Sequence, residues 1–207
     1  SNEEVKDKAN DAVRVNGKEL QVRVVGEGGN LGATQLGRIE FARNGGNICT
    51  DAIDNSAGVD CSDHEVNIKI LFAHIMQKTA MSVEQRNKIL ESMTDNVSEL
   101  VLRDNYLQTL LVRSASSREH YTLPNHLAFM RKLEKAGILD RKIEFLPNDA
   151  EIKARDADGK GLTSPELSVL LAYSKMTLDK DILGSALVED KDFDDLLLAY
   201  FPTHLQA

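Results

Sequence analysis

Apolar residues recur at helical spacing through most of the chain after Cys61. In the stretch that follows Ser82, for example, Ile89, Met93 and Val97 stand four residues apart, which places them on one face of a helix. Such a stripe needs another apolar surface to cover it, so these segments are expected to pack on one another. The chain is therefore predicted to be mainly α.

Start and stop signals divide this part of the chain into six expected helices. Ser62 and Ser82 each stand three residues before a Glu or Gln, which is the pattern of a capping box. Pro124 favours the first turn of a third helix, and Gly137 favours its C-terminal end. The other three expected helices begin at Thr163 or occupy residues 179–187 and 192–201.

The first quarter of the chain has a β-prone pattern instead. Alternating apolar residues on both sides of Asn16-Gly17 predict a hairpin of residues 13–15 and 20–25. Two further short strands are predicted over residues 38–42 and 48–52. No regular alternation of strands and helices follows, which excludes a complete doubly wound domain. The expected fold is a helical domain preceded by a small β portion.

Charge and cysteine content exclude several classes of protein. The chain has 25 Lys and Arg against 33 Asp and Glu, and a net charge of −8 would repel a nucleic acid or a polyphosphate surface. No apolar run reaches the roughly 18 residues of a membrane span. Cys49 and Cys61 form no CxxC pair, which argues against a zinc ribbon and favours a reducing, cytoplasmic setting. Ser1-Asn2 resembles the remnant of a cleaved tag, so a piece of a longer protein is expected.

Two features suggest binding sites, and each has a plain structural alternative. The glycine-rich segment 26–31 follows a predicted strand, where open α/β sheets bind their ligands, but Leu31 stands where a dinucleotide fingerprint needs its third glycine. The segment is thus either a ligand loop or a simple turn. Ser62 is expected to cap a helix, and the free N–H groups of that helix start would also suit a carboxylate.

Other combinations of polar residues are interpreted structurally. Ser62, Asp63 and His64 are consecutive, so on a helix they diverge and cannot act as a catalytic triad. The five histidines include no pair four residues apart, so no helix-borne zinc site is expected. Turn and cap roles are favoured over a cation site for four aspartates, which are Asp51, Asp54, Asp60 and Asp63.

Several segments resemble glutamate dehydrogenases. Residues 27–31 resemble the Glu-Gly-Ala-Asn segment of that family, and residues 57–65 are similar to its Gly-Gly-Val-x-x-Ser-x-x-Glu segment. Residues 45–56 and 162–176 resemble the large bacterial NAD-dependent branch in particular. The chain is accordingly identified as a fragment from the C-terminal region of such an enzyme.

The resemblance implies an activity and a set of site residues. The family oxidatively deaminates L-glutamate to 2-oxoglutarate and ammonia, and hydride passes to NAD. By position, Asn30 would lie at the nicotinamide-ribose end of the cofactor, and the backbone of Gly28 and Gly29 would let the cofactor approach closely. Ser62 would bind the side-chain carboxylate of the substrate. No catalytic residue is assigned, because the family's catalytic lysine and aspartate are not found here. No metal ligand is assigned either. The fragment alone is expected to be inactive.

The resemblance also implies the organisation and partners of the chain. Residues 1–60 would be the end of a Rossmann-type NAD-binding domain, and residues 61–207 a helical C-terminal region. The expected partners are the rest of the parent polypeptide and L-glutamate or 2-oxoglutarate, with the parent a homo-oligomer and neither nucleic acid nor membrane involved. Two alternatives stay open: a dehydrogenase of another amino acid, and a helical interaction or regulatory module that binds partners through residues 89–111 or 167–173.

Overall fold

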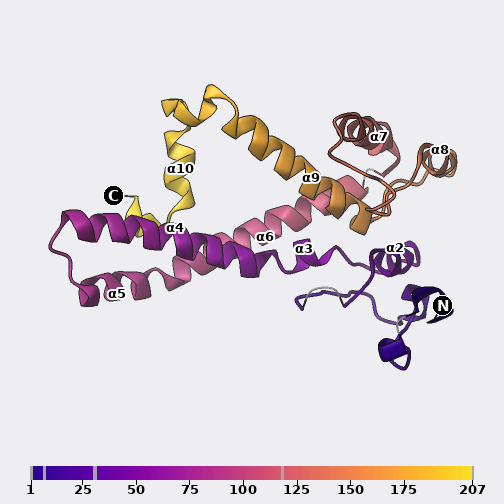
Figure 1. Cartoon of the computed structure of the whole chain (residues 1–207), viewed down its shortest axis with the longest axis horizontal. Helices are drawn as coiled ribbons and strands as arrows, with labels where there is room; N and C mark the ends of the chain where they lie inside the picture. The colour runs from indigo at the N-terminus through magenta and orange to yellow at the C-terminus, as the bar shows by residue number, and fades with distance from the viewer. Residues whose placement is uncertain (1, 7, 30–31, 118, 207) are drawn as a thin grey trace. The chain divides into compact units, whose positions relative to one another are not determined.

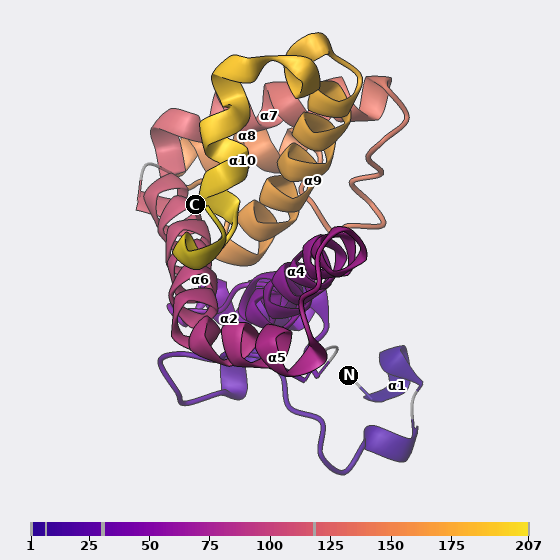
Figure 2. The same ribbon diagram turned by 90° about the vertical axis from the view of Figure 1, so that its left-hand side faces the viewer.

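The computed structural model describes residues 2–6, 8–29, 32–117 and 119–206. These residues are mainly helical, which confirms the predicted helical character (Figures 1 and 2). They form two compact units. The first comprises Ser1–Asp51 and Val112–Leu171, and the second comprises Ala52–Leu111 and Ala172–Ala207. None of the described helices is both long and apolar enough to cross a membrane.

The helices are distributed over both units. Those of the first unit are α1 (Asn2–Val5), α2 (Gln35–Arg43), α7 (Glu119–Lys135) and α8 (Asp149–Ala157). Those of the second unit are α4 (Ser56–Lys78), α5 (Val83–Ser92) and α10 (Asp194–Tyr200). Three helices contribute residues to both units, namely α3 (Asp51–Asp54), α6 (Thr94–Ser117) and α9 (Ser164–Leu183). Short 3-10 helices occur at η1 (Lys8–Asn10), η2 (Gly17–Glu19), η3 (Ala186–Glu189), η4 (Lys191–Phe193) and η5 (Thr203–Leu205).

The predicted hairpin around Asn16-Gly17 is wrong. These residues open the 3-10 helix η2, where the Asn16 N–H donates to the Glu19 carboxylate at 2.6 Å. Gly17 packs directly on α2, because a Cβ added there would lie only 2.7 Å from the backbone nitrogen of Phe41. The glycine therefore permits a close backbone approach rather than a two-residue turn.

The two other predicted strands are also wrong. Residues 38–42 lie inside α2, whose start is capped by Thr34 through a hydrogen bond from the Gly37 N–H at 3.1 Å. Ile39 and Phe41 are both buried, and their alternation was mistaken for a strand pattern. Residues 48–52 are not a strand, because α3 begins at Asp51.

A single parallel β-bridge joins Val24 to Asn47 within the described residues. The Val25 N–H donates to the Asn47 carbonyl at 3.0 Å, and the Asn47 N–H donates to the Arg23 carbonyl at 2.9 Å. Helix α2 lies between the two paired segments in the sequence. The local order is therefore extended segment, helix, parallel extended segment.

Of the predicted helix starts, the one at Ser62 is wrong and the one at Ser82 is confirmed. α4 begins at Ser56 and runs through Ser62, although Gly58 and most other residues of this stretch have low helix propensity, so tertiary context overrides the local preference. At Ser82, the Gln85 N–H donates to Oγ at 3.2 Å, and the Ser82 N–H donates to the Gln85 side chain at 2.8 Å. This is the expected capping box.

The remaining helix signals are largely confirmed. α7 begins at Glu119, so Pro124 lies inside it and not in its first turn. Gly137 has a φ of +69° just beyond the end of α7, as expected of a C-terminal glycine. α9 follows Thr163 and extends to Leu183, and α10 occupies most of the predicted segment 192–201. In place of the predicted helix over residues 179–187, the end of α9 is followed by the 3-10 helix η3.

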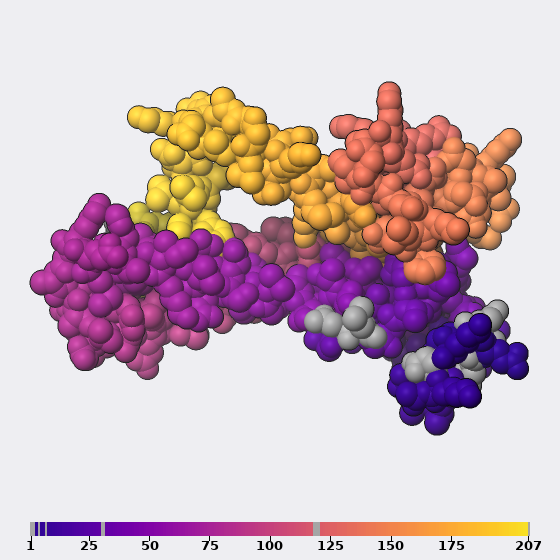
Figure 3. Space-filling model, in the orientation of Figure 1, coloured from indigo at the N-terminus to yellow at the C-terminus, as the bar shows by residue number. Residues whose placement is uncertain are grey.

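Each unit has its own apolar core. In the second unit, Ile68, Phe72 and Met93 are buried where α5 and α6 return alongside α4 (Figures 1 and 2). Side chains fill the space between the ribbons of α4 and α5 on the face shown in Figure 3. The buried side chains of the first unit come mainly from α7, α8 and α9 and their connections, and they include Leu123, Met130, Leu133, Leu139, Leu146, Ile152, Leu162, Leu167 and Leu170.

Candidate functional site

Glu27 closes the glycine-rich loop that follows the β-bridge. One carboxylate oxygen accepts a hydrogen bond from the Gly32 N–H, and the other accepts one from the guanidinium of Arg38 in α2. Arg38 is buried and also lies 3.8 Å from Asp51, at the start of α3. Burial alone would raise the pKa of Glu27, but the hydrogen bonds from Arg38 and Gly32 hold that pKa below its usual value. The loop is thus anchored to α2 by an ionised carboxylate.

The two glycines assigned to the cofactor have open space beside their backbone. A Cβ added at Gly28 or Gly29 would meet no heavy atom within 4 Å among the described residues. Neither glycine has a positive φ. Neither packing nor backbone conformation in the described residues therefore requires glycine at these positions. The open space would let a ligand approach the backbone. Asn30, the third cofactor residue assigned by resemblance, lies outside the described residues.

Ser62 does not occupy a helix start. It lies inside α4, beyond the first turn, where backbone N–H groups are already used by the helix. Its side chain is exposed, and its hydroxyl donates to the Val59 carbonyl at 2.7 Å. The anion-binding argument from free N–H groups is therefore wrong, and the substrate role of Ser62 rests on the resemblance. The glycine loop belongs to the first unit and Ser62 to the second.

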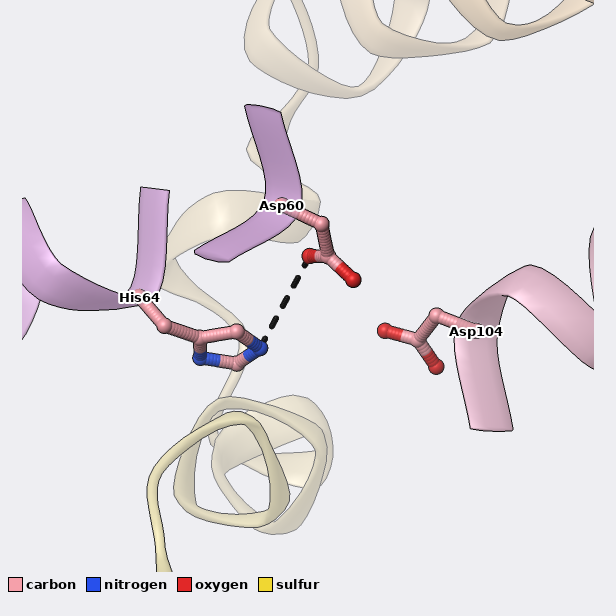
Figure 4. Close-up of side chains that lie close together, drawn as sticks. All are labelled: Asp60, His64 and Asp104. Carbon is pink, nitrogen blue, oxygen red and sulfur yellow. Dashed lines mark ion pairs between the residues drawn. The ribbon is translucent and has the colours of Figure 1, made fainter. Parts of the chain in front are cut away.

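A polar cluster that was not predicted surrounds His64 in the second unit. Asp60 and His64 are four residues apart on α4, and Asp104 faces them from α6 (Figure 4). Burial raises the pKa of Asp60, and although His64 opposes this shift, the charges of Asp104 and Asp63 add to it. The spacing of Asp60 and His64 was the only signal in the sequence, because Asp104 is brought close by tertiary packing.

Asp63 belongs to a second polar contact, with Tyr200 of α10. The Tyr200 hydroxyl donates to the Asp63 carboxylate at 2.7 Å and accepts a hydrogen bond from the Asn67 side chain at 2.9 Å. Burial raises the pKa of Tyr200 to about 12, and the Asp63 carboxylate adds to this effect. Asp60 and Asp63 lie within α4, so the interpretation of these two aspartates as turn or cap residues is wrong.

Comparison with known proteins places the chain in one family. Residues 1–115 match the family model of the bacterial NAD-glutamate dehydrogenase catalytic domain, and residues 159–207 match that of the glutamate dehydrogenase C-terminal region. Three proteins named NAD-specific glutamate dehydrogenase are similar to the chain. The protein from Halomonas elongata is 48% identical over 202 residues, 98% of the chain. The protein from Pseudomonas aeruginosa is 52% identical over 190 residues, 92% of the chain.

The third relative, from Mycobacterium tuberculosis, is 46% identical over 206 residues, 100% of the chain. The chain spans only 12–13% of the length of these three relatives. The matched family model covers more than half of the chain and includes both the glycine loop and Ser62. The chain therefore belongs to the bacterial NAD-glutamate dehydrogenase family.

Proposed function

We propose that the chain is part of an NAD-dependent glutamate dehydrogenase, which converts L-glutamate, water and NAD to 2-oxoglutarate, ammonia and NADH. The observation that carries this proposal is the similarity of nearly the whole chain to proteins named NAD-specific glutamate dehydrogenase, at 46–52% identity. At this level of identity the local structure around the glycine loop and Ser62 is expected to be shared. The substrate and cofactor are those that the names of the relatives imply.

In this proposal, residues 1–60 supply the end of a Rossmann-type NAD-binding domain and residues 61–207 the helical region that follows. The parallel bridge between Val24 and Asn47, with α2 between them in the sequence, supports a Rossmann-type origin of the first part. A parallel pair joined through a helix is the repeating unit of such a domain. The rest of the sheet would come from the parent polypeptide.

The glycine loop would bind NAD at the carboxyl end of the first paired segment. Gly28 and Gly29 would let the cofactor approach the backbone, and Asn30 would contact its nicotinamide-ribose end. The open space beside the two glycines and the anchoring of the loop by Glu27 support this role. A binding segment whose neighbouring residues are held in place binds a ligand at a lower cost in conformational entropy.

Ser62 would bind the side-chain carboxylate of glutamate. A serine hydroxyl favours a carboxylate there over the apolar side chain of leucine, valine or phenylalanine, because an apolar group would leave the hydroxyl without a partner. The catalytic lysine and aspartate of the family would lie elsewhere in the parent, which is expected to be a homo-oligomer. The isolated chain would then hold part of a site and no catalytic residue.

The first test is steady-state NADH formation from L-glutamate by the full-length parent and by the 207-residue chain. We expect activity in the parent and none in the chain. Activity in the isolated chain would contradict the division of the site. A folded parent that reduces NAD with another amino acid but not with glutamate would overturn the substrate assignment.

The second test is Ser62→Ala in the full-length parent. A hydrogen bond to a charged group contributes about 1.5–3 kcal/mol, so kcat/KM for glutamate is expected to fall by roughly ten- to a hundredfold. Ser92→Ala is the matched control, because the Ser92 hydroxyl is also exposed and donates at 2.7 Å to the carbonyl three residues earlier. Equal kinetics of the two variants would remove Ser62 from the site.

A further inference from the structure

The Asp60, His64 and Asp104 side chains bring three potential metal ligands together in the second unit. One ligand atom from each residue lies within 4.8 Å of the other two. Figure 4 shows the His64 ring directed between the two carboxyl groups, with Asp60 on the same helix and Asp104 on α6. The three residues thus come from two helices that face each other.

His64 lacks the hydrogen bonds that a buried histidine normally makes. The side chain is 2% exposed, and neither ring nitrogen has a hydrogen-bond partner among the described residues. One carboxylate oxygen of Asp60 is also buried and has no partner in the part of the chain that the structure describes. Buried polar atoms without partners destabilise a fold by about 1–3 kcal/mol each, so they need another explanation.

The spacing of these atoms suits metal coordination better than a hydrogen bond. The Nε2 atom of His64 lies 3.7 Å from Oδ1 of Asp60, which is too long for a hydrogen bond. Two ligands of a tetrahedral zinc ion, each bonded at about 2.1 Å, are roughly 3.4 Å apart. A cation between these atoms would therefore require movements of only a few tenths of an ångström for this pair.

Contacts on the other side of His64 hold its ring in place. Tyr200 stacks on the imidazole with a centroid distance of 4.5 Å and an interplanar angle of 22°. The hydrogen bonds of its hydroxyl to Asp63 and Asn67 fix Tyr200 in turn. Stacking covers the face of the ring and leaves Nε2, at its edge, directed at Asp60. A ligand held in this way loses little conformational freedom when it binds a metal.

The charged groups around the three side chains leave the carboxylates accessible to a cation. Two carboxylates meet one imidazole, and the two cationic side chains nearest to them also have other contacts or are exposed. Lys175 of α9 interacts electrostatically with Asp60, but burial lowers its pKa, and its ammonium donates a hydrogen bond to Gln108. The exposed side chain of Arg103 contacts Asp104 at 3.3 Å. Asp104 is itself 46% exposed, which gives an ion access from solvent.

We propose that Asp60, His64 and Asp104 bind one divalent transition-metal ion, with the chemistry of Zn²⁺, that joins α4 to α6. Imidazole nitrogen and carboxylate oxygen are both ligands of zinc, whereas Mg²⁺ and Ca²⁺ prefer oxygen alone, so the imidazole favours a transition metal. A water molecule would complete the tetrahedron on the exposed side of Asp104. The ion would give a partner to the buried Nε2 atom of His64.

This site is independent of the proposed substrate contact. Successive helical residues are about 100° apart, so Ser62 points roughly opposite to Asp60 and His64. The Ser62 hydroxyl is exposed and bonded within its own helix. A measurement of metal binding can therefore fail without affecting the proposal for glutamate, and the reverse is also true.

The test is Zn²⁺ binding by the 207-residue chain, measured by competition with a chromophoric chelator after the protein has been stripped of metal. All proteins carry Cys61→Ser, because thiolates bind zinc and the exposed Cys61 follows Asp60 directly in the sequence. We expect one Zn²⁺ per chain. Asp104→Asn should weaken binding about tenfold or more, since even the loss of an outer-shell partner costs 10–100-fold in affinity.

Glu99→Gln is the matched control, because it removes one exposed carboxylate from the same helix. It should leave the affinity within about twofold, and Lys175→Gln should tighten binding by removing a competing cation. His64→Gln is a second ligand variant, and circular dichroism checks that each protein is folded. The absence of saturable binding, or equal affinities of Asp104→Asn and Glu99→Gln, would overturn the proposal.

Discussion

The Glu166 carboxylate is buried at the start of α9 and has charged and neutral partners. Both of its oxygens accept hydrogen bonds at 2.8 Å from the guanidinium of Arg155, in α8. The Thr163 N–H and hydroxyl donate to it at 2.7 and 2.8 Å. Because the side chain is only 1% exposed, removing it leaves the Arg155 charge without its buried partner.

We predict that Glu166→Ala lowers the free energy of unfolding by about 3–5 kcal/mol, the usual cost of breaking a buried ion pair from one side. Urea unfolding followed by circular dichroism measures this change. The control is Lys160→Ala, which removes the ion pair with Asp158 between two exposed side chains and should have little effect. A similar stability of both variants would show that the Glu166 network does not stabilise the fold.

His126 of α7 makes the stability of the chain sensitive to mild acid. Burial lowers the pKa of His126 below its ordinary value of 6.5, and its Nδ1 atom is buried with no hydrogen-bond partner in the residues that the structure describes. The unfolded chain therefore binds a proton more readily than the folded chain. Stability is complete above the unfolded pKa and is lost as the pH falls below it.

The urea midpoint is accordingly expected to fall between about pH 7.5 and pH 5.5, and His126→Gln should make it less dependent on pH over that range. Asp149 does not interfere, because its hydrogen bonds with Arg131 and Arg141 hold its pKa below 3.8. His74→Gln, which changes an exposed histidine of α4, is the control. An unchanged pH dependence in His126→Gln would exclude His126 as its source.

At the level of the elements, helical periodicity predicted most of what lies after Cys61 because those helices pack through continuous apolar stripes. The predictions failed where two local signals competed. Residues 38–42 alternate in polarity, but the Thr34 cap and the burial of Arg38 beside Glu27 make them helical. α8 was missed although Asn148 and Glu151 form a capping box, because the helix is short and carries little apolar signal.

The two candidate sites also differ in whether they could be predicted from the sequence. The glycine loop could be found from the sequence, because its residues are contiguous and bear a family motif. The cluster around His64 could not, because Asp104 lies forty residues beyond it in the chain and reaches it only through the packing of α6 on α4. The predicted helix start at Ser62 is wrong because α4 already begins at Ser56. A capping pattern of four residues does not show whether the preceding residues are also helical.

The contact between η2 and α2 provides a prediction at this scale. A Cβ at Gly17 would lie 2.7 Å from the Phe41 nitrogen and closer still to the Gly37 carbonyl, so Gly17→Ala must separate two backbones. Overpacking of this kind costs about 1–3 kcal/mol. Gly26→Ala is the control, because its added Cβ would meet no heavy atom of the described residues within 4 Å. Equal urea midpoints for the two variants would contradict the close approach.

For the molecule as a whole, the chain matches only 12–13% of the length of relatives that are about eight times as long. One face of α6 is unusually apolar for a surface exposed to water. Its exposed side chains include Leu102, Tyr106, Leu107, Leu110 and Leu111. Contiguous apolar surface of this kind usually marks a contact with another part of a protein or with a partner.

We expect the rest of the parent polypeptide to cover this α6 face. Oxidative footprinting with mass spectrometry compares the modification of Tyr106 in the 207-residue chain and in the full-length parent, with buried Phe72 as the internal reference. Tyr106 is 64% exposed in the chain, so its modification should fall severalfold in the parent while that of Phe72 stays low in both. Equal modification of Tyr106 would mean that the face stays open in the parent. The apolar stripe would then be available to a separate partner, as an interaction module requires.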